Sequence, residues 1–156
     1  MVSPLLILSL GLVNSSSVEQ CAYPGGQCWE LKMQKCKGSQ NWTLHGLWPE
    51  WGNGCEGPDF DMNALRDIRQ DLQSKWPSCP EYGESEDEFW RHEWQKHGTC
   101  SGLNELNYFQ TALRLHDQFA GQCSSERSIC QVCFSKDLQS QESCPSQLGS
   151  VSEVIV

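Results

Sequence analysis

Two segments dominate this sequence: WTLHGLWP at residues 42–49 and FWRHEWQKHGTC at residues 89–100. Their side chains of chemical interest are three of the four histidines of the chain, a carboxylate and an amine: His45, His92, His97, Glu93 and Lys96. Two histidines can exchange protons with a substrate near neutral pH, and the charged groups can stabilise a transition state. This set suits in-line phosphoryl transfer in a substrate that carries its own nucleophile, as RNA does in its 2′-hydroxyl.

The second segment is expected to be helical, and residues four apart on a helix share one face. His92 pairs with Lys96 in this way, and Glu93 pairs with His97, so one helical surface presents all four. A zinc-protease motif has two histidines four apart, whereas here they are five apart and the fourth position is a lysine. We therefore expect no metal site, and we expect no cofactor.

Hydrophobic periodicity and turn residues predict both helices and strands in the chain. The expected elements are an irregular Cys- and Gly-rich segment at 19–40, a strand at 40–47, a helix at 62–76 capped by Asp61, a helix at 87–98, a helix at 106–119, a strand at 129–134 and a turn at 135–141. His116, within the third helix, has no partner in sequence and is expected to be a packing or surface residue.

The length of 156 residues indicates one domain, and ten cysteines in so short a chain indicate disulfides formed in an oxidising compartment. Residues 1–17 contain an apolar run that is too short to span a bilayer, and we expect a cleaved signal peptide there. Residues 18–156 would then form a single domain with no membrane segment.

The pair Cys130 and Cys133 has no second pair of that spacing, which favours structural disulfides over a metal or redox site.

The chain is acidic, with a formal net charge of −9 and a pI of about 4.8. Proteins that hold nucleic acid by releasing counterions are usually basic, so a scaffold-type RNA-binding protein is disfavoured. An enzyme that binds one phosphate locally and releases its product is compatible with this charge.

The two segments resemble the active-site segments of the ribonuclease T2 family. The similarity runs from about residue 41 to residue 119, with a weaker one at residues 129–134 and at Cys144 with the proline that follows it. The resemblance implies an α+β fold with an antiparallel sheet flanked by helices and stapled by disulfides. It also implies a secreted or endolysosomal/vacuolar, acid-active, metal-independent endoribonuclease. The substrate would be single-stranded RNA, cleaved by transphosphorylation through a 2′,3′-cyclic phosphate, and the protein would be a monomer.

The same resemblance implies that His45, His92, Glu93, Lys96 and His97 are catalytic. We expect His97 to act as the base and His45 as the acid. Lys96 and Glu93 would stabilise the five-coordinate phosphorane, Glu93 by accepting a proton or a hydrogen bond, and His92 would hold a phosphate oxygen. Trp48 is expected either to wall the site and position His45 or to stack on a base.

The resemblance also implies a disulfide between Cys55 and Cys100 and makes one between Cys133 and Cys144 possible. Cys79 is expected to join either Cys28 or Cys36. Asn41 begins the sequon Asn41-Trp42-Thr43 and is a candidate glycosylation site, although it adjoins the first segment.

The chain departs from the family pattern in two places. We find no aromatic-rich strand before the first cysteines, and Phe119 is only ten residues from Ile129, where the family has a longer segment. A catalytically impaired, truncated relative with a binding role, or with none, is therefore the alternative. A disulfide-rich secreted binding module or a metal hydrolase is less compatible with the complete set of histidines, Glu93 and Lys96.

Overall fold

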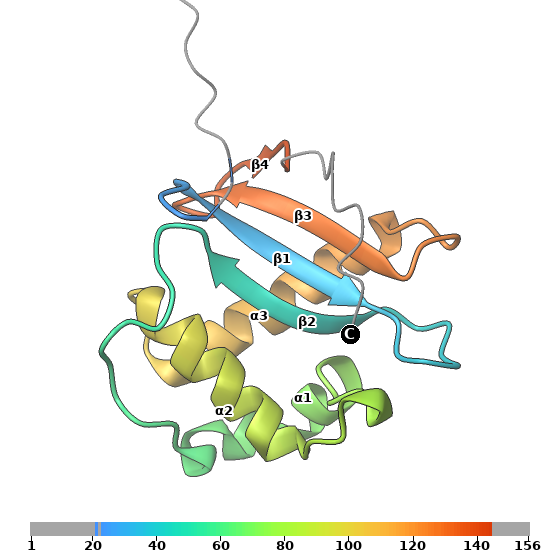
Figure 1. Ribbon diagram of the computed structural model, residues 1–156, viewed down its shortest axis with the longest axis horizontal. Coiled ribbons are helices and arrows are strands. Elements are labelled where there is room, and N and C mark those ends of the chain that lie inside the picture. The colour runs from blue at the N-terminus through green and yellow to red at the C-terminus, as the bar shows by residue number, and fades with distance from the viewer. Residues whose placement is uncertain (1–20, 22, 145–156) are drawn as a thin grey trace, which may run out of the picture.

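A computed structural model describes Cys21 and residues 23–144 as one antiparallel sheet packed against helices (Figure 1). The strands are β1 (Cys28–Gln34), β2 (Thr43–Pro49), β3 (Ile129–Ser135) and β4 (Gln141–Glu142), and the α-helices are α1 (Arg69–Lys75), α2 (Glu86–Lys96) and α3 (Glu105–Phe119). Short 3₁₀ helices are η1 (Met62–Ile68), η2 (Pro80–Tyr82), η3 (Gly98–Cys100) and η4 (Ala120–Gln122). The described strands are ordered β2-β1-β3-β4, so the expected α+β class with an antiparallel sheet is confirmed.

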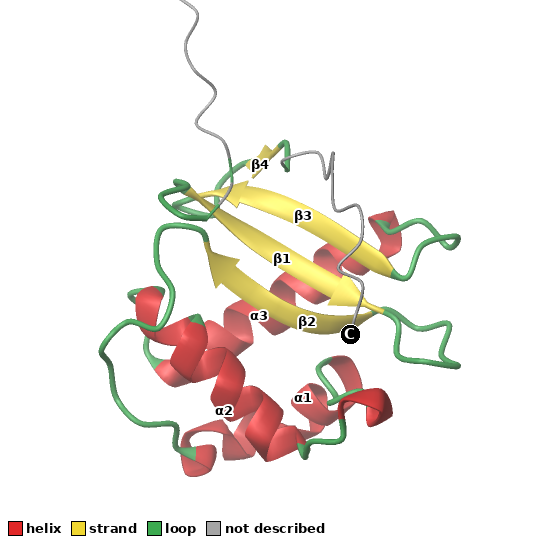
Figure 2. Ribbon diagram, in the orientation of Figure 1, coloured by secondary structure: helices red, strands yellow, loops and turns green. Residues whose placement is uncertain are grey.

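One face of the sheet forms the core with the helices. α3 runs behind the sheet in the view of Figure 2, while α1 and α2 lie beyond the β2 edge. The largest fully buried side chains include five aromatic residues from the helical part and its ends: Trp76, Trp90, Trp94, Tyr108 and Phe109. Each indole N–H among them donates to a main-chain carbonyl, which satisfies the polar atom that burial would otherwise leave unpaired.

The prediction of an irregular segment at 19–40 is wrong for residues 28–34. These residues form β1, which lies between β2 and β3 in the sheet. Trp29, Leu31 and Met33 alternate on the core face and are at most 2% exposed. The cysteines and turn residues on both sides of this short strand obscured an alternation that indicates a strand.

The helices agree with the expected positions to within a few residues. Asp61 caps a helix as expected, through its side chain and the Asn63 N–H, but the first two turns are the 3₁₀ helix η1 and the α-helical part begins only at Arg69. Leu65 and Leu72, two of the periodic apolar residues, are fully buried. α2 ends at Lys96, two residues before the expected end, and the 3₁₀ helix η3 follows.

All ten cysteines are paired. The disulfides are Cys21–Cys28, Cys36–Cys79, Cys55–Cys100, Cys123–Cys130 and Cys133–Cys144. Cys79 therefore joins Cys36, and the alternative partner Cys28 is bonded to Cys21 instead. Cys130 and Cys133 belong to two different disulfides, as expected for structural cysteines.

The expected signal peptide at 1–17 and the C-terminal boundary at residue 156 lie outside the described residues. Within the described part of the chain, no helix has the length and apolarity needed to cross a membrane.

Candidate active site

His45 lies on a β-bulge in β2. Leu44 pairs with Met33 and Gly46 pairs with Lys32, so His45 has no partner on β1. Strict alternation cannot bury both Leu44 and Leu47, which are three residues apart, yet both are fully buried. The extra residue resolves this conflict and redirects the His45 side chain, as bulges do beside active sites.

The main chain at the bulge is fixed from the helical side. The indole N–H of Trp76 donates to the His45 carbonyl at 2.9 Å. Trp76 is itself fully buried and packs on Phe109 of α3 with 5.1 Å between ring centroids. The core therefore holds the histidine in place through its backbone.

α2 supplies the other four side chains expected in the site. The helix begins at a capping box, in which the Ser85 hydroxyl accepts from the Glu88 N–H while the Glu88 carboxylate accepts from the Ser85 N–H. Further along the helix, Glu93 and the C-cap residue His97 are buried, whereas His92 and Lys96 are exposed. His97 is the C-cap of α2, and its N–H still bonds to the Glu93 carbonyl at 3.0 Å.

Trp48 connects the two segments. Its indole N–H donates to Glu93 Oε2 at 2.9 Å. The indole stacks on the imidazole of His97 with centroids 4.9 Å apart and meets the edge of His45 at 5.4 Å. Trp48 therefore contacts both expected proton-transfer groups, and its stacked partner is His97 rather than His45.

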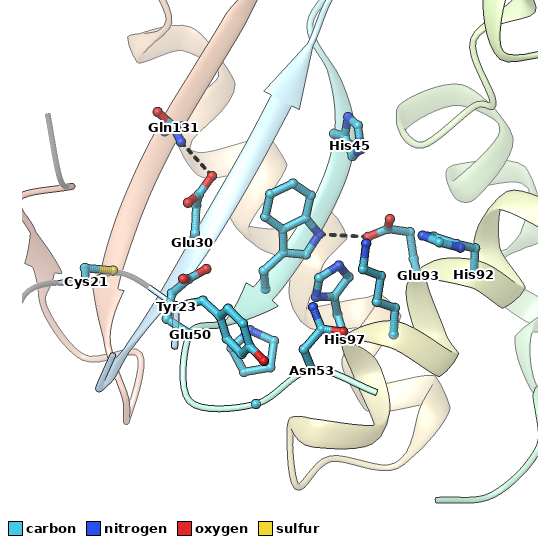
Figure 3. Close-up of a pocket in the computed structure, with 14 residues that line it drawn as sticks. Cys21, Tyr23, Glu30, His45, Glu50, Asn53, His92, Glu93, His97 and Gln131 are labelled. Atoms are coloured by element: carbon cyan, nitrogen blue, oxygen red, sulfur yellow. Dashed lines mark hydrogen bonds between the residues drawn. The ribbon is translucent and has the colours of Figure 1, made fainter. Parts of the chain in front are cut away.

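All the predicted catalytic residues and Trp48 line one cavity of about 450 Å³. Figure 3 shows the side chains of His45, His92, Glu93 and His97 gathered on one side of it. The opposite side carries Glu30, Glu50 and Gln131, with Tyr23 and Asn53 on the loops below. The structure thus brings together every side chain that the sequence placed in the site.

Burial and neighbouring cations depress the pKa of both central histidines. Desolvation, followed by the charges of Lys32, His92 and Lys96, lowers the pKa of His45 to about 4. Desolvation, Lys96 and His92 lower the pKa of His97 to about 3. Both imidazoles are therefore neutral at pH 7 in the unliganded protein.

Glu93 behaves in the opposite way. Its side chain is almost fully buried at 1% residue exposure, and desolvation raises its pKa to about 8 despite the hydrogen bond from Trp48 and the charge of Lys96. The carboxyl is therefore neutral at acidic pH and can donate a hydrogen bond, whereas the sequence had suggested an acceptor.

Several polar residues of the site were not anticipated from the sequence. Gln34, at the end of β1, contacts His45 Nδ1 through its Oε1 at 2.8 Å. Glu30 accepts a hydrogen bond from Gln131 at 2.8 Å across the β1–β3 pair. The alternation of Trp29, Leu31 and Met33 on the core face would have placed Glu30 and Gln34 on the site face, had residues 28–34 been taken as a strand.

The remaining expectations concern metal binding, glycosylation and His116. Among the described residues, no three His, Cys, Asp or Glu side chains are grouped so that they could hold a metal ion. Asn41 is exposed, while Thr43 of its sequon is buried and donates to the Gln34 carbonyl at 3.2 Å. His116 is a packing residue, and its Nε2 lies 3.0 Å from the carbonyl oxygen of Trp42.

Comparison with known proteins points to one family. A model of the Ribonuclease T2 family matches residues 17–145. Ribonuclease DdI of Dictyostelium discoideum is 40% identical over 92 residues, which cover 53% of this chain and 40% of the relative. Ribonuclease 1 of Arabidopsis thaliana is 35% identical over 138 residues, which cover 74% of this chain and 58% of that protein.

Solved structures show the same fold. Human RNase T2 superposes with a TM-score of 0.62 and 20% identity, over 75% of this chain and 89% of that chain. An RNase-related protein from Calystegia sepium gives a TM-score of 0.62 and 25% identity, over 80% of this chain and 93% of that chain. By sequence, the chain spans 40% of the length of Ribonuclease DdI and 39% of that of Ribonuclease T2-A of Mus musculus.

Proposed function

Because the chain belongs to the ribonuclease T2 family, we propose that it is an endoribonuclease that cleaves single-stranded RNA by transphosphorylation. The observation that carries the proposal is the placement of His45 and His97 against the same Trp48 indole, in one cavity with Glu93, Lys96 and His92. Two proton-transfer groups from separate elements are thereby held beside a cluster that can bind a phosphate.

In the proposed reaction, neutral His97 removes the proton of the ribose 2′-hydroxyl, and the 2′-oxygen attacks the adjacent phosphorus. The bond from phosphorus to the 5′-oxygen breaks, and protonated His45 donates its proton to that oxygen. The products are a 2′,3′-cyclic phosphate and a free 5′-hydroxyl, so no water is consumed in this step. Each proton transfer contributes about 10²–10⁴-fold.

The charge that develops on the phosphorane is met by three groups of α2. Lys96 and His92 are exposed at the cavity and can approach the phosphate oxygens. Glu93, whose pKa is about 8, donates a hydrogen bond from its neutral carboxyl. Such groups stabilise the transition state most effectively when they are held in place beforehand, as Trp48 and the helix hold Glu93.

An acidic optimum follows from the same electrostatics. His45 must be protonated to act as an acid, and its pKa of about 4 confines that state to acidic solution. A bound phosphate adds negative charge beside His45, Lys96 and His92, which raises the pKa of the acid in the complex.

We also infer the setting of the protein. The five disulfides require an oxidising compartment, which supports secretion or an endolysosomal or vacuolar location after cleavage of a signal peptide at residues 1–17. The proposed enzyme is a monomer of one domain from residue 18 to residue 156, needs no metal or cofactor, and carries a glycan on exposed Asn41.

Two observations favour a second candidate, a catalytically impaired relative that retains only a binding role or none. The chain spans about two fifths of the length of Ribonuclease DdI, and Phe119 is followed within ten residues by β3. Segments that shape the substrate cleft in longer relatives can therefore be missing.

The deciding experiment is cleavage of an end-labelled single-stranded RNA at about pH 5 with EDTA present, using protein folded under oxidising conditions. The proposal predicts fragments that end in a 2′,3′-cyclic phosphate. His45→Ala and His97→Ala should each reduce the rate by at least about 10²-fold while leaving the melting temperature within a few degrees. A cooperative melt without any cleavage would support the impaired relative, and loss of cleavage only in EDTA would indicate a metal enzyme.

A further inference from the structure

Gln34 is the last residue of β1 and is only 2% exposed. Its amide has three polar neighbours, one on β2 and two on the segment of η2 and its N-cap Cys79. Its Oε1 lies 2.8 Å from Nδ1 of His45 and accepts a hydrogen bond from the Tyr82 hydroxyl. Its Nε2 donates to Cys79 Sγ at 3.3 Å.

This arrangement determines which way the amide faces. The sulfur of the Cys36–Cys79 disulfide has no hydrogen to donate, so the amide nitrogen faces Cys79 and the amide oxygen faces Tyr82 and His45. The atom that faces His45 is therefore an acceptor, so Nδ1 of His45 must carry a hydrogen. Nε2 is left as the only nitrogen of this imidazole that can exchange a proton with a substrate.

The backbone around Gln34 is held as firmly as its side chain. Gln34 pairs with Thr43 in the β1–β2 ladder, and the Thr43 hydroxyl donates to the Gln34 carbonyl at 3.2 Å. The bulge that redirects His45 begins two residues after Thr43. The amide and the imidazole are thus fixed to the same short stretch of sheet.

We infer that Gln34 is a positioning residue that holds His45 in the tautomer with Nδ1 protonated, and that Tyr82 holds Gln34 in turn. The geometric part of this inference stands without any activity, while its catalytic consequence rests on the proposed ribonuclease function. As the acid, His45 donates from Nε2, and the Gln34 oxygen stabilises the charged ring by accepting from Nδ1 at the other end.

The charged groups around His45 make this support necessary. Lys32 of β1 and His92 and Lys96 of α2 all oppose a positive charge on His45, and Glu93 beside them is neutral at acidic pH. A smaller pocket adjoins the cavity at His45, His92 and Glu93. Its other carboxylate is Glu84, which follows η2 in the chain. The Gln34 oxygen is the hydrogen-bond acceptor that contacts the ring directly.

Substitution of Gln34 tests the inference. Gln34→Glu places a carboxylate against Nδ1 and should raise the pKa of His45 by about 1–3 units. Gln34→Ala removes the acceptor, so the neutral ring should become a mixture of tautomers and kcat should fall by about 10- to 100-fold, with KM changed less than about twofold. Tyr82→Phe, at a position that is 44% exposed, should lower kcat by a smaller factor without disturbing the core.

Two readouts are measured on each variant. Long-range ¹H–¹⁵N spectra of the imidazole report the tautomer and the pKa of His45 without any turnover, and the pH dependence of kcat/KM reports the acid in catalysis. Gln110→Glu, an exposed position on α3, adds the same charge far from His45 and serves as the matched control. Melting curves show that each variant is folded, and Tyr82→Phe provides the test if Gln34→Ala does not fold.

The expected result is a raised His45 pKa in Gln34→Glu, a mixed tautomer in Gln34→Ala, and no change in Gln110→Glu. An unchanged tautomer and pKa in folded Gln34→Glu and Tyr82→Phe would overturn the inference, even if the protein cleaves RNA. If the spectra change as expected but the wild-type protein does not cleave RNA, the proposed function fails and the positioning of His45 by Gln34 stands.

Discussion

Gly46 occupies the most crowded position of the site. A Cβ built there would overlap both the Trp48 indole nitrogen and the Glu93 carboxylate oxygen. These are the two atoms whose 2.9 Å hydrogen bond joins the first segment to α2. The absence of a side chain at residue 46 therefore allows the bulged strand to lie directly beneath this bond.

The first prediction is that Gly46→Ala breaks the link between Trp48 and Glu93. The methyl group must displace one of the two side chains, and we expect a loss of about 1–3 kcal/mol in the free energy of unfolding from overpacking. The rate of RNA cleavage should fall by at least about 10²-fold, because a displaced donor or acceptor of this kind costs that much. Urea denaturation and cleavage assays measure the two effects.

Gly121→Ala is the matched control, because nothing lies within 4 Å of a Cβ built at that position. It should change neither stability nor activity appreciably. Full activity in Gly46→Ala would show that the Trp48–Glu93 bond is not needed for catalysis.

The second prediction concerns the pH dependence of kcat/KM, which reports ionisations of the free enzyme. The base His97 must be neutral, so activity should rise as pH increases through its pKa of about 3. The acid His45 must be protonated, so activity should fall as pH increases through its pKa of about 4. The result is a bell with its maximum between these values, and the profile of kcat should lie at higher pH because bound phosphate favours the charged rings.

Lys32→Met separates the two limbs of this bell. The charge of Lys32 lowers the pKa of His45, but it is not among the causes of the shift at His97. Only the descending limb should therefore move to higher pH in this variant. A kcat/KM that keeps rising to neutral pH in the wild-type protein would contradict the assignment of acid and base.

At the scale of residues, the sequence identified the groups that are adjacent in the chain or one helical turn apart. His92, Glu93, Lys96 and His97 follow from helical spacing alone, and the cavity does contain all of them. Gln34 could not be found in this way, because its importance depends on where β1 ends relative to a bulge in β2. The neutral state of Glu93 also could not be predicted, since it depends on burial by Trp48 and the surrounding core.

At the scale of elements, α2 is the part of the fold on which the site depends most. It carries four of the five predicted catalytic residues, and its start is fixed by the capping box of Ser85 and Glu88. Three acidic residues in its first turn, Glu86, Asp87 and Glu88, interact favourably with the positive end of the helix dipole. These interactions stabilise the first turn of α2, while the hydrogen bond from Trp48 to Glu93 joins the helix to β2.

The third prediction is that Ser85→Ala lowers the free energy of unfolding by about 1 kcal/mol, the usual effect of removing an N-cap serine. The hydroxyl no longer accepts from the Glu88 N–H, so the first turn of α2 should fray. Hydrogen exchange should quicken for the amides of that turn, while those near His92 change little. Ser125→Ala is the control, since its exposed hydroxyl makes no hydrogen bond in the structure. Equal stability of the two variants would show that the box contributes nothing.

The elements themselves were predictable where their apolar pattern was long. The three helices and the strands at 43–49 and 129–135 appear within a few residues of the expected positions. β1 was missed because it is only seven residues long and lies between cysteines and turns that indicate irregular structure. Its place in the middle of the sheet depends on pairing with residues up to 107 positions away, from Cys28 to Ser135, and local pattern carries no information on such pairing.

At the scale of the whole molecule, two of the five disulfides connect parts of the chain that local pattern cannot relate. Cys36–Cys79 joins the end of β1 to η2, and Cys55–Cys100 joins the loop after β2 to η3, directly after His97. The choice between Cys28 and Cys36 as the partner of Cys79 could be made only from the fold, because both cysteines precede the first segment and the sequence does not show which one lies beside Cys79. Cys55–Cys100 packs on Gly52 of the cavity wall, and Cys36–Cys79 contacts Gln34, the neighbour of His45, so both long-range disulfides support the site.

The last prediction compares Cys55–Cys100 with a disulfide remote from the cavity. The first closes a loop with a sequence separation of 45 and the second, Cys123–Cys130, one of 7. Chain entropy predicts losses of about 4 and about 2 kcal/mol when each is replaced by two serines. Only the first replacement should also reduce cleavage at temperatures where the protein is folded. The reason is local, since Gly52 of the cavity wall packs on Cys55 and Cys100, and the Trp51 indole donates to the Cys100 carbonyl at 2.9 Å.

Urea denaturation at acidic pH measures the two stabilities, and initial rates on single-stranded RNA measure the activities of the folded fractions. The Cys123–Cys130 variant should keep its rate per folded molecule, because this disulfide closes the short connection between α3 and β3 and neither of its cysteines lines the cavity. If both variants lose activity equally while folded, the cavity depends on the whole disulfide framework rather than on Cys55–Cys100. If neither loses it, the packing of Trp51 and Gly52 alone keeps the loop beside His97.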